Sequence, residues 1–159
     1  MLTLEERVSL INLLQVCLDL PADEREQFEA MTNSPYSGEQ LAAGLATMSG
    51  PKYVILDQDE NALAVCGATQ ERHGVWRVWF LAREEAWLVA EEVTSIAVGL
   101  IQMMFHDYEA HRLEVVCLAK RSRARRWYER HLGLKCEGVM QKFCANGENA
   151  ALYSAVRNW

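Results

Sequence analysis

The sequence lacks several features that would assign it to common protein classes. It has no Cys-x-x-Cys pair, and its five cysteines (Cys17, Cys66, Cys117, Cys136 and Cys144) are widely spread, with no histidine at ligand spacing. We therefore expect no metal site, and an odd cysteine count without a signal peptide favours a reducing cytoplasm. No run of eighteen apolar residues occurs, which predicts neither a membrane span nor a membrane partner.

Length and composition are those of one folded domain. The chain has 159 residues, of which 50% are apolar and 24% are charged. These proportions exclude a disordered chain and suffice for a buried core. We expect a single domain over residues 1–159, with a helical N-terminal region (residues 1–50) and a sheet-containing core (residues 51–159).

Negative charge dominates the chain, but its C-terminal third is basic. The formal net charge is −6; residues 1–60 carry three basic and eleven acidic side chains, whereas residues 110–159 carry ten and four. Seven of the sixteen basic residues form one cluster: Lys120, Arg121, Arg123, Arg125, Arg126, Arg130 and Lys135. This basic cluster predicts an anion-binding surface. A solvated helix face is the structural alternative, and contact with nucleic acid ranks last because the overall charge is negative.

Capping-box patterns mark two of the expected N-terminal helices. Thr3 with Glu6, and Ser37 with Gln40, have the spacing at which two side chains satisfy each other's backbone amides. The first pattern precedes an amphipathic stripe and predicts a helix over residues 4–18. The other helices are expected at residues 22–31 and 37–48.

From residue 52 the apolar period changes from helical to extended. Strands are expected at residues 53–56, 62–69, 75–81, 113–118, 134–142 and 150–156, and a long helix at residues 89–108. The first three strands form a predicted antiparallel meander. This order of elements predicts an α/β (α+β) fold, with a mixed sheet and helices on both of its faces.

The most informative stretch runs from His111 to Gly138. An apolar strand at residues 113–118 is followed by Ser122, which is expected to be the N-cap of a short helix. One face of this helix is apolar: Ala124, Trp127, Tyr128 and Leu132. Gly133 is then expected to end the helix as a left-handed residue.

This stretch resembles the late motif of the GCN5-related N-acetyltransferases (GNAT), Asn-x-x-Ala-x-x-Phe-Tyr-Glu-x-x-Gly-Phe followed by Glu-Gly. The matching residues are Ser122, Ala124, Trp127, Tyr128, Glu129, Gly133, Leu134, Glu137 and Gly138, with one residue fewer before the alanine and one more before the first glycine. The resemblance covers about residues 52–159. More narrowly, from Trp79 onward the chain is similar to short GNAT-like proteins of podoviruses. The family's first strand is not evident, because the chain is expected to begin with a helix.

The resemblance implies both a fold and a chemistry. The implied fold is a GNAT-like mixed sheet whose central parallel strands splay apart and admit the pantetheine arm of acetyl-CoA, the implied cofactor. Tyr128 is implied as the general acid that protonates the thiolate of coenzyme A; the structural alternative is a core aromatic residue. The implied cofactor-binding residues are Phe80, Leu81, Arg83, Ser122 and Arg125.

The phosphate-binding loop is the main departure from the family. Active members usually carry Arg/Gln-x-x-Gly-x-Gly/Ala before the central helix, because glycines let backbone amides approach the pyrophosphate. Residues 82–92 contain no glycine, a bulky Trp87 and four carboxylates, although acidic residues also simply stabilise a helix start. No general base stands out; the candidates near strand ends are Glu71, Glu84, Glu114 and His111.

Two functions stay open on the sequence. The first is an acetyl-CoA-dependent N-acetyltransferase acting on an amine of a small molecule or a protein. The alternative is a catalytically inactive GNAT-like interaction or virion-associated phage protein, which would bind a host protein. A cytoplasmic location (host cytoplasm or virion if phage-encoded) and a homodimer are further expectations.

Overall fold

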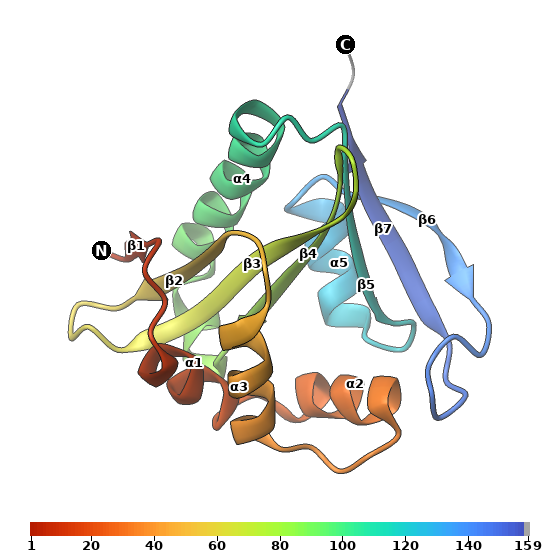
Figure 1. The fold of residues 1–159 in the computed structure, drawn as a ribbon, viewed down its shortest axis with the longest axis horizontal. Helices are drawn as coiled ribbons and strands as arrows, with labels where there is room; N and C mark the ends of the chain where they lie inside the picture. The colour runs from red at the N-terminus through yellow and green to blue at the C-terminus, as the bar shows by residue number, and fades with distance from the viewer. Residues whose placement is uncertain (158–159) are drawn as a thin grey trace. The chain divides into compact units, whose positions relative to one another are not determined.

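The computed structural model describes residues 1–157, which form a mixed α/β fold (Figure 1). The strands form one seven-stranded sheet in the order β1-β2-β3-β4-β5-β7-β6. They are β1 (Thr3–Glu5), β2 (Lys52–Leu56), β3 (Ala62–Arg72), β4 (Val75–Ala82), β5 (Arg112–Leu118), β6 (Lys135–Met140) and β7 (Ala150–Val156). The helices are α1 (Leu10–Cys17), α2 (Ala22–Thr32), α3 (Gly38–Thr47), α4 (Ala90–Asp107) and α5 (Ser122–Arg130), with a 3-10 helix η1 (Glu84–Val89). The predicted fold class is confirmed.

Residue contacts divide the chain into two compact units. The first unit comprises Met1–Ala22, Ser37–Thr69 and Val78–Ile96, and the second comprises Asp23–Tyr36, Gln70–Arg77 and the chain from Ala97 onward. The boundaries cut β3, β4 and α4, so they differ from the predicted division at residue 50. A single domain over residues 1–159 stays a prediction.

The first unit begins with a strand where the sequence predicted a helix. β1 pairs antiparallel with β2. The prediction of a helix from Leu4 is wrong because the capping box forms at Ser9, whose hydroxyl oxygen accepts the Asn12 amide (3.1 Å) while Asn12 Oδ1 accepts the Ser9 amide (3.0 Å). α1 therefore starts at Leu10, and the residues before it extend the sheet. The sheet thus has a first strand, β1, which was not evident from the sequence.

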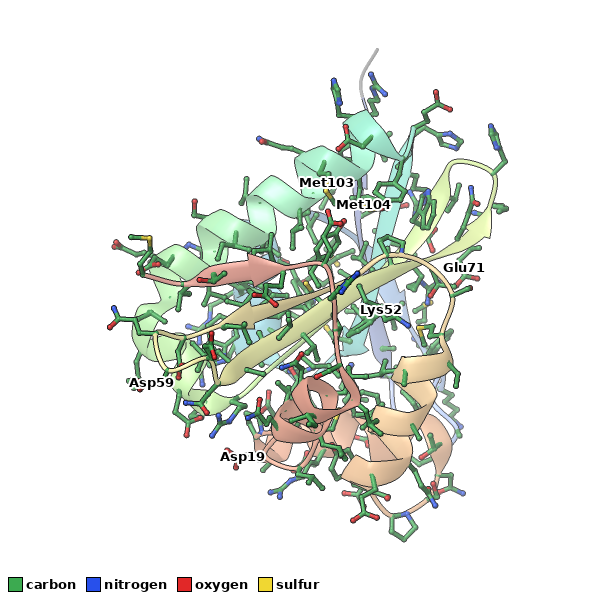
Figure 2. The ribbon with its side chains drawn as sticks, turned by 60° about the vertical axis from the view of Figure 1, so that its left-hand side comes forward. Asp19, Lys52, Asp59, Glu71, Met103 and Met104 are labelled. Atoms are coloured by element: carbon green, nitrogen blue, oxygen red, sulfur yellow. The ribbon has the colours of Figure 1, made fainter. Side chains whose placement is uncertain are left out.

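Polar contacts fix both ends of α3. Ser37 caps its start, as predicted, by accepting the Gln40 amide (3.3 Å). At its other end the Lys52 ammonium (Figure 2) donates to the carbonyl oxygens of Leu45 (3.0 Å) and Met48 (2.8 Å). A positive charge also suits the negative end of the helix dipole. These contacts hold α3 at the start of β2.

The second unit is built around β5. This strand pairs in parallel with β4 at Val75–Arg77, and it pairs antiparallel with β7 along its whole length. Leu118 packs in a core cluster with Ala30 of α2 and Ala150 of β7. β5 is thus an inner strand of the sheet, with β4 at one edge and β7 at the other.

α5 starts one residue earlier than predicted. Ser122 is its first residue rather than its N-cap, and Arg121 occupies the N-cap position without a side-chain capping bond. A tight turn causes the difference, since the Ser122 amide donates to the Lys120 carbonyl (2.9 Å) and brings the chain into helical geometry at that point. At the other end Gly133 has a φ of +68°, which confirms the predicted left-handed residue.

Among the described residues, one helical segment, Glu84–Asp107, is long and apolar enough by length and composition to cross a membrane, with 17% of the tested window buried. The sequence did not predict such a segment, because polar residues interrupt its apolar stretches. The core helix of a folded domain meets the same criterion. Within this segment α4 contributes the buried side chains of Val93, Ala97 and Met104.

Candidate functional site

The end of β4 carries the first group of predicted site residues. Leu81 is buried, and Phe80 packs against the core cluster of the first unit with its ring centre 6.4 Å from that of Trp87. The same cluster includes Ala86 of η1. Packing therefore fixes the strand end that was predicted to hold a cofactor.

The residues after this strand form η1 in place of a glycine loop. A 3-10 helix directs its amides into i→i−3 hydrogen bonds, and the Ala86 amide donates to the Arg83 carbonyl (3.1 Å). No glycine is present to turn the amides outward, and Ala86 is fully buried. The segment that lacks glycine thus folds as the 3-10 helix η1 rather than as an open loop.

Arg83 is held by carboxylates of its own unit. Its Nε and Nη2 each lie 3.0 Å from Asp19 Oδ2, and Nη2 lies 3.6 Å from Glu85 Oε1 (Asp19 in Figure 2). The Asp19 side chain is 60% exposed and that of Arg83 is 22% exposed. Exposed pairs of this kind contribute little to stability and exchange partners readily. The predicted role of Arg83 in cofactor binding stays a prediction, and its guanidinium is paired with carboxylates that are themselves largely exposed.

Tyr128 lies on the inward face of α5, where the helical period placed it. Its side chain is 8% exposed, and its ring centre is 5.4 Å from that of Tyr153 on β7. Burial raises the pKa of Tyr128 well above its usual range. Cys117 and Glu24 raise this pKa further, and Arg121 lowers it. The phenol keeps its proton through the neutral range, which is the state that a general acid needs.

Arg125 fastens α5 to β7. Its Nε donates to the Tyr153 hydroxyl (2.8 Å) and its Nη1 to the Ala119 carbonyl (3.0 Å). The Tyr153 hydroxyl in turn donates to Glu129 (2.6 Å). Burial raises the pKa of Tyr153 to about 12, a shift that Glu129 increases and Arg125 opposes. The guanidinium predicted for phosphate is thus part of a chain of hydrogen bonds inside the second unit.

Arg121 is buried, unlike the other members of the basic cluster. Its guanidinium contacts three side chains of α2: Asp23 (3.0 Å), Glu24 (2.7 Å) and Gln27 (2.7 Å). Burial raises the pKa of Glu24 above its usual range, and Arg121 opposes that shift. The acidic helix therefore neutralises part of the positive charge that predicted an anion-binding surface.

Lys120 and Ser122 lie on either side of Arg121 in the sequence. Lys120 Nζ lies 3.3 Å from Glu26 and 2.8 Å from Glu148, and these three residues line an open polar cavity of about 490 Å³. Ser122 is exposed in the first turn of α5, where helix amides attract anions. Of this pair only Ser122 was a predicted cofactor contact.

Among the candidate general bases, the structure buries only Glu114. Burial acts to raise the pKa of Glu114, but hydrogen bonds from Arg112 (2.7 Å) and Arg77 (3.0 Å) outweigh it and hold this pKa below its usual range. A carboxylate held in this way is a poor proton acceptor. The other candidates are exposed: Glu71, Glu84 and His111.

The predicted site residues fall into one group in each unit. Phe80, Leu81 and Arg83 lie together at the end of β4 in the first unit, and Ser122, Arg125 and Tyr128 lie together on α5 in the second. The sequence did not predict the contacts of Arg121 with α2 or the bond between Tyr153 and Glu129. Charge complementarity between acidic residues 23–29 and the basic cluster could have indicated the first. Nothing in the sequence pointed to the second.

Solved structures share this fold over nearly the whole chain, whereas no family model and no curated protein matches the sequence. One is a ribosomal-protein-S5-alanine acetyltransferase from Vibrio fischeri, with a TM-score of 0.70, 14% identity and coverage of 99% of this chain and 92% of that chain. A GNAT-family acetyltransferase from Bacillus anthracis has a TM-score of 0.74, 10% identity and coverage of 98% and 94%. A spermidine N-acetyltransferase variant from Vibrio cholerae has a TM-score of 0.72, 14% identity and coverage of 98% and 93%. The chain has the fold of the GCN5-related N-acetyltransferases.

Proposed function

We propose that this protein is an acetyl-CoA-dependent N-acetyltransferase whose acceptor is an amine of a small molecule or a protein. The observation that carries the proposal is Tyr128, a buried phenol at the motif position on α5. The similar structures include acetyltransferases named for ribosomal protein S5 and for spermidine, so acceptors of both classes occur on this fold.

The proposed reaction assigns one chemical step to Tyr128. Acetyl-CoA supplies an activated acetyl group as a thioester. The acceptor amine attacks the carbonyl carbon, so that a C–N bond forms, the C–S bond breaks and the departing sulfur needs a proton. Tyr128 gives its phenolic proton to that sulfur, the amine loses its own proton to water, and water returns a proton to the Tyr128 phenolate, which restores the acid. A phenol is protonated at neutral pH even at the usual pKa of tyrosine, so the acid is ready there without the rise in the pKa of Tyr128 that burial causes.

We assign cofactor contacts residue by residue. The backbone of Phe80 and Leu81 is proposed to hold the pantetheine arm. Arg83 is proposed to bind phosphate, because its exposed pair with Asp19 can give way to a bidentate contact. Ser122 is proposed to contribute through the first turn of α5. Arg125 joins these residues only by exchanging its hydrogen bond to Tyr153 for one to phosphate.

Titration calorimetry with acetyl-CoA and with coenzyme A tests the proposal. We expect micromolar binding to the wild type, about tenfold weaker binding to Arg83→Gln and unchanged binding to Tyr128→Phe. In a coupled assay, Tyr128→Phe should transfer acetyl groups about a hundredfold more slowly. An absence of binding at millimolar ligand would refute the enzyme proposal.

The second candidate is a catalytically inactive GNAT-like interaction protein, such as a virion-associated phage protein that binds a host protein. The 3-10 helix in place of a glycine loop favours it, as do the contacts that Arg83, Arg121 and Arg125 make within their own units. It predicts no coenzyme A binding in the same titration. Both candidates are proposed to act in the cytoplasm or, if the protein is phage-encoded, in the host cytoplasm or the virion. Sedimentation of the purified chain tests the proposed homodimer.

A further inference from the structure

The short helix α5 has few buried contacts that fix its orientation. Of its nine residues only Tyr128 is buried, and its N-cap residue, Arg121, makes no side-chain capping bond. A helix is positioned mainly by the face that it packs against other elements. Because α5 buries a single side chain, its rotation about its own axis depends on a small number of contacts.

Tyr153 of β7 is the fixed point for several of these contacts. Tyr153 is 0% exposed. β7 lies between β5 and β6, and Tyr153 is paired with Val115 on one side and with Cys136 on the other. A residue in the middle of a sheet opens to solvent less readily than a residue of a short helix at the surface. Tyr153 therefore holds α5, rather than the reverse.

The Tyr153 hydroxyl bonds to two residues of α5 that flank Tyr128 in the sequence. It accepts a hydrogen bond from Arg125 Nε (2.8 Å) and donates one to Glu129 Oε1 (2.6 Å). Arg125 and Glu129 are four residues apart, so their side chains lie one above the other on the helix surface. Two bonds from one hydroxyl to successive turns therefore oppose rotation of the helix.

The Tyr153 ring contacts Tyr128 directly. The two ring centres are 5.4 Å apart and the ring planes are tilted by 59°, a geometry in which aromatic rings attract each other. The Arg125 guanidinium lies 5.8 Å from the centre of the Tyr153 ring, within the range of a cation–π contact. One side chain of β7 thus touches the phenol ring and both of its hydrogen-bonded neighbours on α5.

We propose that Tyr153 is a positioning residue for Tyr128: its ring and its two hydroxyl hydrogen bonds hold the Tyr128 phenol in the place from which it protonates the departing sulfur. The effect on catalysis rests on the proposed acetyltransferase function. The restraint on the Tyr128 ring does not, because it is a property of the folded chain alone.

Steady-state kinetics separate the ring of Tyr153 from its hydroxyl. Tyr153→Phe keeps the ring and removes both hydrogen bonds, whereas Tyr153→Leu also removes the ring. We expect kcat for acetyl transfer to fall about fivefold in Tyr153→Phe and about fiftyfold in Tyr153→Leu, because a misplaced catalytic group slows the chemical step. KM for acetyl-CoA should rise by no more than about twofold in either variant, since the acid rather than cofactor binding is disturbed. A folded Tyr153→Leu variant with the kcat of the wild type would overturn the proposal.

Glu129 gives a second test that leaves Tyr153 in place. Glu129→Ala removes the acceptor of the Tyr153 hydroxyl and should lower kcat about threefold, whereas Glu129→Gln keeps an acceptor oxygen and should stay within about 1.5-fold of the wild type. Glu29→Ala, at an exposed position on α2 of the same unit, is the matched control and should leave kcat unchanged.

A double-mutant cycle shows whether Glu129 acts through Tyr153. Glu129→Ala combined with Tyr153→Phe should lower kcat no further than Tyr153→Phe alone, because both changes remove the same hydrogen bond. Independent losses that multiply would overturn the role of the hydroxyl. If Tyr153→Leu does not fold, Tyr153→Phe and the Glu129 variants decide the proposal.

NMR of the Tyr128 ring tests the restraint without an activity assay. In protein with carbon-13-labelled tyrosine, in which the Tyr128 signal is identified by its loss from Tyr128→Phe, the rate of ring flips reports how tightly the neighbours pack. Tyr153→Leu should accelerate these flips about tenfold or more, and Tyr153→Phe should stay within about threefold of the wild type because its ring remains. An unchanged flip rate in Tyr153→Leu would overturn the restraint. If the wild type transfers no acetyl group, the proposed function fails, and the ring flips still decide whether Tyr153 holds Tyr128.

Discussion

Arg83 and Arg121 occupy similar places in the two units, yet their ion pairs differ in kind. Each arginine follows the end of a strand and binds a carboxylate at the end of an N-terminal helix: Arg83 binds Asp19 after α1, and Arg121 binds Glu24 at the start of α2. The nitrogen–oxygen distances are 3.0 Å and 2.7 Å. The exposed fractions are 22% and 60% for the first pair but 7% and 14% for the second. Burial, more than distance, separates the two.

This difference decides what each arginine can do. In water the attraction between opposite charges is screened, and an incoming anion competes for the guanidinium on nearly equal terms. A buried pair is screened less, and neither partner can leave without exposing the other charge to an apolar interior. Arg83 is therefore suited to recruitment by a phosphate, whereas Arg121 is suited to holding two elements together.

The largest expected effect follows from removing the buried arginine. Arg121→Gln should lower the free energy of unfolding by about 3–5 kcal/mol, because it leaves Glu24 buried without its partner. Arg83→Gln should cost under about 1 kcal/mol. Urea unfolding of both variants, with Arg25→Gln as the exposed control, makes the measurement. Similar losses in the free energy of unfolding for Arg83→Gln and Arg121→Gln would contradict the conclusion that burial distinguishes the two ion pairs.

Glu114 extends the comparison to a buried carboxylate. Glu114→Gln should cost about 2–3 kcal/mol at pH 7, less than Arg121→Gln because its partners Arg112 and Arg77 are partly exposed and remain solvated. Since arginine partners hold the pKa of Glu114 below its usual 4.5, its contribution is complete above pH 4.5. That contribution is lost as pH falls through the lower pKa of the folded state. Unfolding midpoints at pH 3–7 should therefore vary less with pH in Glu114→Gln than in the wild type.

Tyr153 is an intermediate case, because its partner Arg125 is half-buried. Tyr153→Phe should cost about 1 kcal/mol at pH 7 through the lost hydrogen bonds. Burial raises the pKa of Tyr153 from 10.0 to about 12. The unfolded chain therefore releases this proton first, and wild-type stability falls as pH rises from 10 to 12. The stability gap between wild type and Tyr153→Phe should narrow over that range, and urea unfolding of both proteins at pH 9–12 makes the measurement.

Local patterns predicted most of the fold. β7 has the predicted bounds, 150–156, and Gly133 adopts the left-handed conformation expected after a helix. β1 was missed because three residues carry no periodicity, and because Thr3 offered a capping pattern that competed with the one at Ser9. Only pairing with β2 decides between them, and that contact is tertiary.

In the candidate site, too, local patterns predicted some features, and contacts between distant residues decided the others. Helical spacing placed Tyr128 on the inward face of α5, because the period of a helix determines which side chains share a face. Arg121 looked like an available cation, since its partner Asp23 is 98 residues away in the sequence. Whether a charged side chain is exposed or paired depends on which elements fold against it. A local sequence pattern does not predict these tertiary contacts.

The last prediction has the smallest expected effect. It tests whether Arg83 can exchange its carboxylate partner for a ligand, rather than how much the ion pair stabilises the fold. Asp19→Asn should leave the fold within about 0.5 kcal/mol of the wild type. It should also strengthen coenzyme A binding about threefold, or about 0.7 kcal/mol, because Arg83 no longer has to leave a carboxylate. Glu24→Gln should leave that affinity unchanged, since Arg121 stays buried against Asp23 and Gln27. Parallel calorimetric titrations of the two variants compare the arginines directly. Weaker binding in Asp19→Asn would mean that the carboxylate orients Arg83 toward its ligand, so that the exposed pair would be a part of the site rather than its competitor.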